Sequence, residues 1–325
     1  MKINNIIKLT KKYYDYFINI NESINYQYID NKNLLNKYIH EINNTRFSNN
    51  INITKYVNKC NKIFYINYNN INIFVYCYNY IDCYNFNKFI KIIKRLAIID
   101  KIYNLNKNFN IHVSLSNYPR FLPSKKEIFD SKHVNGGFTI PDGNNIYIFR
   151  KDEYSKVIIH EFIHHIHIIN DSLFNLNQYH IKLLKKKFDI SNETSLLPAE
   201  GVVEFWTTIY NTIFISIEYN FSFKLLIKKE INFSIYQIFK IINNYKSPIW
   251  KERTNVFSYF FIKTILLFNY NKFLQLKLPY DHIEFINYIF DNFDLIKYKK
   301  YFNKIKNNFN YKSNKSLDFL IFSKF

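Results

Sequence analysis

The order of apolar and polar positions predicts a small β-sheet in the first half of the chain. The runs 63–68 and 71–77 are rich in β-branched and aromatic residues, and Asn69 and Asn70 between them tolerate the positive φ of a hairpin turn. After a helical pattern at about 86–103, apolar and polar residues alternate over 109–116, which indicates a half-buried strand. This alternation places His112 on the polar side of the strand, so we expect its side chain to be exposed.

Two further strands are predicted directly before an apolar helix. Residues 135–140 and 145–149 have strand patterns, and Pro141, Asp142 and Gly143 between them are typical of a turn. A helix then begins near Asp152. A short edge strand directly before this helix would matter, because the unpaired backbone of a sheet edge can hold an extended peptide.

The second half of the chain has helical periodicity throughout. We expect helices at about 179–187, 198–218, 222–243, 254–269, 281–291 and 295–306, and a frayed stretch after Asn307. Residues 1–60 predict one or two short helices and an Asn-rich connector at 43–52. The fold class is therefore α+β, with a small mixed β-sheet, a helix that carries the candidate site, and a mainly helical C-terminal half.

The helix near Asp152 contains the motif H-E-x-x-H, formed by His160, Glu161 and His164. Because an α-helix has about 3.6 residues per turn, the two histidines lie on one face and can direct two imidazole nitrogens at one metal ion. Glu161 lies beside them and is the candidate general base. In a chain of this composition the motif is expected by chance only roughly 0.01 times. The alternative is a buried helix in which both histidines bond to neighbouring backbone.

A third metal ligand is predicted on a later helix. A catalytic zinc has three protein ligands and one position for water, so two histidines need one partner from elsewhere. Glu200 and Glu204 are four residues apart and share a helical face. We assign metal ligation to Glu200, and to Glu204 the orientation of a ligand histidine through its second ring nitrogen. The swapped assignment stays open.

Glycine usage marks the same region. The chain has 4 Gly in 325 residues, far below the usual share of about 7%. All of them lie in the stretch that brackets the motif, at Gly136, Gly137, Gly143 and Gly201. The rest of the composition is crowded with Asn, Ile, Lys, Tyr and Phe, as in the product of an AT-rich genome. We interpret the glycines as backbone freedom retained near a site.

At these residues the chain resembles the gluzincin group of zinc metallopeptidases, whose pattern is H-E-x-x-H followed on a later helix by E-x-x-x-D or E-x-x-x-E. The resemblance covers roughly 135–210. It implies a zincin-like fold, one Zn²⁺ ion held by His160, His164 and Glu200, Glu161 as the base, and Glu204 as the supporting acid. The Gly-Gly strand, the H-E-F-I-H helix and the E-G-V-V-E-F-W helix together also resemble poorly characterised zincin-like proteins of large DNA viruses.

The sequence patterns together with the resemblance predict three segments and one activity. They are an N-terminal helical or connector segment at 1–60, a zincin-like catalytic domain at 61–218 and a helical C-terminal subdomain at 219–325. The expected function is a single-zinc metallopeptidase that acts on a peptide or protein substrate. Two alternatives remain, namely an inactive zincin scaffold that serves as a binding protein, and a basic nucleic-acid-associated protein with an incidental motif.

Two other site types do not fit the sequence. The metzincin pattern needs Gly at 167 and His at 170, where this chain has His167 and Asn170. A site of His160, His164 and His167 on one helix would span about 10 Å along the axis, so we place His167 beside the metal ligands or in the core. His165 points away from the site and is expected to be packed or exposed. The candidates for stabilising an oxyanion are Tyr259, His180, His282 and Tyr154.

The net charge of +20 at pH 7 invites a nucleic-acid or membrane-surface interpretation. The lysines, however, are scattered along the whole chain, which indicates a solvated basic surface, and none of the common nucleic-acid motifs occurs. We therefore expect no specific nucleic-acid partner. The sequence leaves the oligomeric state open.

The three cysteines, Cys60, Cys77 and Cys83, are odd in number and form no C-x-x-C pair, which favours a reducing compartment. The first residues lack the pattern of a signal peptide, and no apolar run is long enough to span a bilayer. We expect a soluble intracellular protein with no transmembrane segment, located in the cytoplasm, or in the host cytoplasm or virion if it is viral.

Overall fold

The chain forms two compact units in the computed structural model, which describes residues 2–48, 50–80, 83–105, 107–124, 127–140, 143–166, 176–245, 247–277, 280–309 and 316–322. Unit 1 comprises Met1–Ile6, Phe121–Val134 and His167–Phe325. Unit 2 comprises Ile7–Arg120 and Asn135–Ile166. The expected segments 1–60, 61–218 and 219–325 follow the order of the sequence, whereas each unit combines segments that are distant in sequence. The three-segment division stays a prediction.

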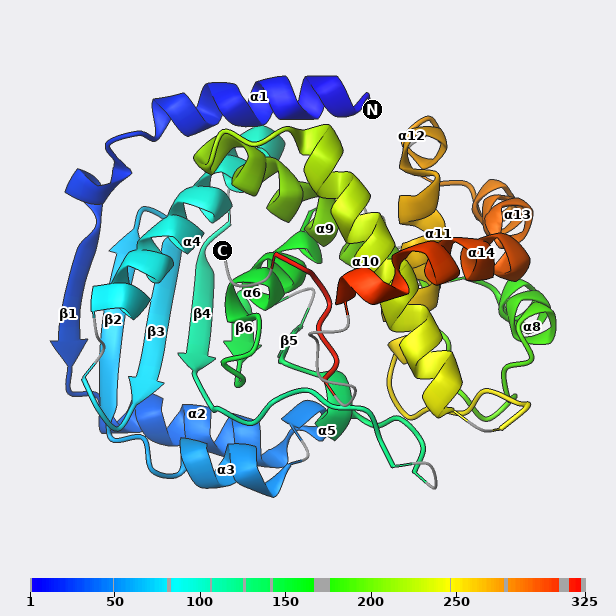
Figure 1. The fold of residues 1–325 in the computed structure, drawn as a ribbon. Helices are drawn as coiled ribbons and strands as arrows, with labels where there is room; N and C mark the ends of the chain where they lie inside the picture. The colour runs from blue at the N-terminus through cyan, green and yellow to red at the C-terminus, as the bar shows by residue number, and fades with distance from the viewer. Residues whose placement is uncertain are drawn as a thin grey trace. The chain divides into compact units, whose positions relative to one another are not determined.

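Unit 2 is built on a mixed sheet of six strands in the order β1-β2-β3-β4-β6-β5 (Figure 1). The pairs β3–β4 and β4–β6 are parallel and the other three are antiparallel. The strands are β1 (Asn25–Ile29), β2 (Lys62–Tyr68), β3 (Ile71–Cys77), β4 (Phe109–Ser114), β5 (Gly137–Thr139) and β6 (Asn145–Ile148). The predicted small mixed sheet is thus confirmed, and the protein has a mixed α/β architecture.

Both sheet faces of unit 2 carry helices. One face is apolar and packs against α4 (Cys83–Tyr103) and α6 (Tyr154–Ile163), and Phe109 of β4 lies 4.4 Å from Phe162 of α6 between ring centroids. The other face contacts α2 (Lys32–Asn44) and α3 (Ile51–Val57). Helix α1 (Ile3–Tyr16) begins in unit 1 and continues into unit 2.

The predicted hairpin and site helix occur where the sequence placed them. Asn69 has φ of 49° in the turn between β2 and β3. The strand directly before the site helix is β6, but β6 lies inside the sheet, and the edge at this side is β5. Strand β1 was not predicted, because its residues are almost all exposed and lack an alternating apolar pattern.

The expected exposure of His112 is wrong. Its side chain is only 7% exposed, and its ring lies between those of Phe74 and Tyr147 at centroid distances of 5.2 and 5.0 Å. The alternation over 109–116 correctly separates two faces of β4. It does not reveal that the more polar face is also covered by neighbouring aromatic side chains.

Unit 1 is mainly helical, as predicted. Helix α9 packs against α10, α11 and the π-helical turn η3. The main helices of this unit in the described ranges are α5 (Ser131–Val134), α8 (Gln178–Lys187), α9 (Pro198–Glu218), α10 (Phe223–Asn244), η3 (Phe257–Ile262), α11 (Lys263–Phe268), α12 (Tyr270–Phe273), α13 (His282–Asn292) and α14 (Leu295–Ile305). Two short 3₁₀ turns precede β1 and α3, at η1 (Ile20–Ser23) and η2 (Arg46–Ser48), and a third, η4 (Lys306–Phe309), follows α14.

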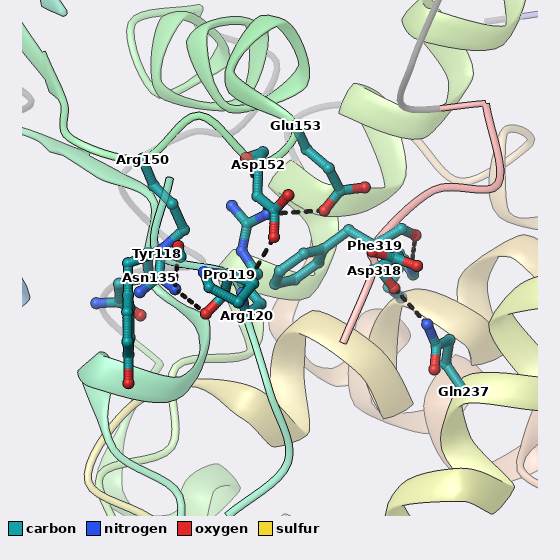
Figure 2. A network of polar contacts seen from close by, with 11 residues as sticks. Tyr118, Pro119, Arg120, Asn135, Arg150, Asp152, Glu153, Gln237, Asp318 and Phe319 are labelled. Atoms are coloured by element: carbon teal, nitrogen blue, oxygen red, sulfur yellow. Dashed lines mark hydrogen bonds and ion pairs between the residues drawn. The ribbon is translucent and has the colours of Figure 1, made fainter. Parts of the chain in front are cut away.

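The expected fraying after Asn307 is wrong for residues 316–322. Leu317 and Leu320 are fully buried, and the Gln237 side chain donates to the Asp318 carbonyl at 2.8 Å (Figure 2). Buried Glu230 accepts hydrogen bonds from the backbone N–H groups of Ile321 and Phe322, both at 3.2 Å. Polar composition suggested a loose end, but partners on α10 satisfy this backbone.

In the described part of the chain, no helix is both long enough and apolar enough to cross a membrane.

Candidate metal centre

The site helix α6 lies in the interior of unit 2, and each of its ten residues from Tyr154 to Ile163 is buried. Apolar residues fill most of its circumference, which is typical of a helix enclosed by other elements. It contacts α4 on one side and strands β5 and β6 on the other. Because these neighbours exclude water, polar side chains at the C-terminal end of α6 lie in a sheltered position.

His160, Glu161 and His164 form the predicted cluster. One ligand atom of each lies within 4.8 Å of those of the other two, and in the described residues this is the one group of three or more such side chains that can hold a metal ion. The rings of His160 and His164 are 5.1 Å apart between centroids, at an interplanar angle of 72°. His160 and Glu161 are buried, whereas His164, at the C-cap of α6, is partly exposed. Of the three side chains, His164 is thus the one most exposed to solvent.

Two buried arginines, Arg120 and Arg150, lie near the N-terminal end of α6 (Figure 2). Arg120 donates to the Glu153 carboxylate at 2.8 Å and to the Asp152 carbonyl at 3.1 Å. Arg150 donates through Nε to the Asn135 carbonyl at 3.0 Å and through Nη1 to the carbonyl oxygens of Tyr118 and Pro119. Burial, followed by the nearby charge of Arg120, lowers the pKa of Arg150 to about 9, so this side chain remains charged at neutral pH.

Glu153 has a backbone conformation that non-glycine residues rarely adopt. Its φ is 54° at the N-cap of α6. A left-handed conformation at such a residue costs about 1–3 kcal/mol and persists only where the surrounding structure imposes it. The buried ion pair with Arg120 holds the Glu153 side chain in place. This pair therefore fixes where α6 begins, and α6 in turn carries the histidines.

Gly136 permits this arrangement. A Cβ atom at residue 136 would collide with the Arg120 guanidinium and would lie 3.2 Å from a Val157 methyl group. Within the described ranges, no glycine has a positive φ. The expectation that these glycines supply backbone freedom is therefore corrected: at Gly136 the requirement is the close approach of a buried arginine.

His165 ties the C-terminal end of α6 to the sheet edge. Its Nε2 lies 2.9 Å from the Thr139 hydroxyl on β5, and its Nδ1 lies 3.5 Å from the Lys107 ammonium. The side chain is 9% exposed, so of the two expectations for His165 the packed one is confirmed. These contacts could not be predicted from the pattern around the motif, because Thr139 and Lys107 are distant from it in sequence.

Glu200 and Glu204 lie on α9, as predicted, but α9 belongs to unit 1 whereas the histidines belong to unit 2. Glu204 is buried and Glu200 is partly exposed, but one carboxylate oxygen of each residue is buried. Gly201 follows Glu200 because a Cβ atom there would lie 2.6 Å from an Ile262 methyl group and 2.9 Å from the Ser258 carbonyl. Metal ligation by Glu200 stays a prediction, as does the supporting role of Glu204.

The candidates for stabilising an oxyanion also belong to different units. Tyr154 is buried at the start of α6, where its ring contacts Phe89 of α4. The other three lie in unit 1, where the rings of His180 and His282 are 6.0 Å apart and Tyr259 contacts Phe319. The expectation for His167 falls outside the described residues. The role of the four oxyanion candidates stays a prediction.

Comparison with known proteins gives no relative. No family model matches the chain, no curated protein matches it, and no solved structure matches it. Any functional conclusion therefore rests on the residues themselves.

Proposed function

We propose that this protein is a single-zinc metallohydrolase of the gluzincin type, and that its substrate is a peptide bond. The observation that carries the proposal is the sheltered cluster of His160, Glu161 and His164 at the end of a buried helix. Zinc accepts two imidazole nitrogens as ligands, and the Glu161 carboxylate lies close enough to both histidines to act on a water molecule held by the same ion.

The roles of the residues follow from their chemistry. His160 and His164 would hold the ion, and Glu200 would complete the protein ligands, as the resemblance to gluzincins implies. Bound zinc supplies a Lewis acid and brings the pKa of a water molecule near neutrality. Glu161 would take the proton of the attacking water and pass it to the leaving amine. The edge strand β5, which contacts α6, offers backbone groups that can align an extended peptide.

The ligand roles can be tested by zinc content and turnover in the same preparations. The purified chain is loaded with zinc sulfate, dialysed and analysed for metal, beside His160→Ala, Glu161→Gln and the control His40→Ala, which alters an exposed histidine on α2. We expect about one zinc per chain in the parent, in Glu161→Gln and in the control, and far less in His160→Ala. Digestion of a mixed peptide library, followed by mass spectrometry, should show cleavage by the parent and none by Glu161→Gln.

Two results would refute the proposal. If the parent holds no stoichiometric zinc after loading, the motif is a packed helix and not a metal site. If Glu161→Gln still cleaves peptides at the parental rate, the carboxylate is not the base. Bound zinc without any turnover would instead support the inactive binding protein.

A further inference from the structure

The sheet face of unit 2 that faces α2 carries two continuous rows of side chains. Residues paired across neighbouring strands share a face, so equal positions form rows perpendicular to the strands. One row is amide, and hydrogen bonds join the side chains of Asn67 to Asn72, Asn72 to Asn110, and Asn110 to Asn145. The other row is aromatic and consists of stacked rings of Tyr65, Phe74, His112, Tyr147 and Phe138.

His112 links the aromatic row to the amide row. Its Nδ1 lies 2.9 Å from the Tyr76 hydroxyl, and its Nε2 lies 3.4 Å from Oδ1 of Asn145. Burial lowers the pKa of His112 to about 4, so the imidazole is neutral at pH 7. If the Tyr76 hydroxyl donates to Nδ1, the ring proton lies on Nε2 and points toward the amide row.

Helix α2 packs against this face of the sheet. The Tyr38 hydroxyl donates to Ser114 Oγ at 2.7 Å, and the Tyr38 ring stacks on Tyr76 with 3.8 Å between centroids. Leu34, one turn before Tyr38, and Lys37, directly before it, lie on the same helix and line a space next to the two rows. Between them and the sheet lies a pocket of about 260 Å³. A cavity of about 150 Å³ already holds benzene, so this pocket has room for one ring and a polar substituent.

The chemistry of the lining favours an anion with an apolar body. Leu34, Phe74 and Tyr147 supply apolar wall, and none of the described residues that line the pocket is Asp or Glu. Lys37 has an exposed ammonium group, and none of the ion pairs within the described ranges involves it. Asn145 uses Oδ1 toward Asn110 and His112, and no described residue accepts from its Nδ2. A residue with an ammonium group and a residue with an amide N–H group thus border the same pocket, and both groups can bind an anion.

We propose that the pocket under α2 is a binding site for a small aryl carboxylate, with its carboxylate between Lys37 and Asn145 and its ring against Leu34 and Phe74. The site lies on the face of the sheet opposite α6, so it is separate from the histidine cluster. It requires neither zinc nor hydrolysis. Its failure and the failure of the proposed peptidase activity are therefore independent results.

The test uses benzoate as the probe and benzamide as its neutral counterpart, each titrated calorimetrically into the full chain. We expect saturable binding of one benzoate per chain, with benzamide about tenfold weaker because a charged hydrogen-bond partner is lost. Lys37→Met should weaken benzoate binding about tenfold for the same reason. The matched control is Lys32→Met, since Lys32 is an exposed lysine on the same helix that does not line the pocket. The affinity of Lys32→Met for benzoate should equal that of the parent.

Several outcomes would overturn the site. They are an absence of saturable benzoate binding, equal affinity for benzoate and benzamide, and an equal loss of affinity in the Lys37 and Lys32 variants. The last result, especially if inorganic phosphate binds as well as benzoate, would indicate general attraction of anions to a basic chain. Because both lysines are exposed, circular dichroism should show the parental fold in both variants.

Discussion

The Arg120 guanidinium and the Glu153 carboxylate form a 2.8 Å ion pair in which the two side chains are only 2% and 4% exposed. Glu153 is also the residue with positive φ that directly precedes the site helix. A buried pair of this kind contributes little net stability compared with an apolar replacement, but removal of one partner leaves a buried charge. Its structural effect here is to fix the start of α6.

Arg120→Met should strongly destabilise the protein. The substitution leaves the Glu153 carboxylate buried without this partner, which costs about 3–5 kcal/mol in comparable sites. Unfolding in urea, followed by circular dichroism, measures the free-energy change. The control is Lys132→Met, because Lys132 pairs with Glu127 at 3.0 Å on the surface, where both side chains are well exposed. Lys132→Met should change the free energy of unfolding by at most about 1 kcal/mol. Equal effects in both variants would show that the buried pair has no special role.

Gly201→Ala should destabilise the protein although it improves helix propensity. In a helix interior, Ala is favoured over Gly by about 1 kcal/mol. At this position, however, the added Cβ would lie 2.6 Å from an Ile262 methyl group and 2.9 Å from the Ser258 carbonyl. Overpacking of this kind costs about 1–3 kcal/mol, so we expect a net loss in thermal unfolding. Gly143→Ala is the comparison, because its closest contact would be 3.2 Å. A higher melting temperature for Gly201→Ala would contradict the observed packing of α9 on η3.

His112→Phe should make the stability less dependent on pH between 6.5 and 4. The folded pKa of His112, about 4, is below the unfolded value of 6.5, so the unfolded chain binds more protons in this range. Stability from the neutral ring is therefore fully present above pH 6.5 and is lost as pH falls toward 4. Its magnitude is about 3 kcal/mol by linkage. Phenylalanine keeps the stacked row but does not titrate.

The measurement is urea unfolding of the parent and of His112→Phe at pH 7 and pH 4.5. His40→Phe alters an exposed histidine on the same unit and should retain the parental pH dependence. If the parent and His112→Phe lose the same stability on acidification, then His112 is not the residue whose protonation opposes folding.

Glu200→Gln and Glu204→Gln distinguish the two carboxylate roles. If Glu200 is a ligand, Glu200→Gln should lose most zinc binding. If Glu204 only orients a ligand histidine, Glu204→Gln should lower the zinc affinity about 10–100-fold. Competition with a chromophoric zinc chelator measures the zinc affinity of both variants. The reverse order would assign ligation to Glu204, and parental affinity in both variants would remove α9 from the metal centre. Glu193→Gln, at an exposed carboxylate of the same unit, is the control.

Local pattern determined much of this protein. The alternation over 109–116 and the apolar runs 63–68 and 71–77 specify strands, and the spacing of His160 and His164 specifies a shared helical face, because these properties depend only on residues close in sequence. The same local information fails for β1. Its exposed residues carry no alternating apolar pattern, and its place in the sheet depends on pairing with β2.

Contacts between distant segments were decided by the tertiary structure alone. His112 is polar by pattern, yet it is buried because Phe74 and Tyr147 arrive from neighbouring strands. The glycines at 136 and 201 appear from sequence as flexible points, but the fold uses them where Arg120 and Ile262 approach closely. Residues close in sequence thus predicted most of the elements and the H-E-x-x-H motif. The fold decided the burial, the anchoring of α6 and the pocket under α2, since each requires surfaces that meet only after the chain has packed.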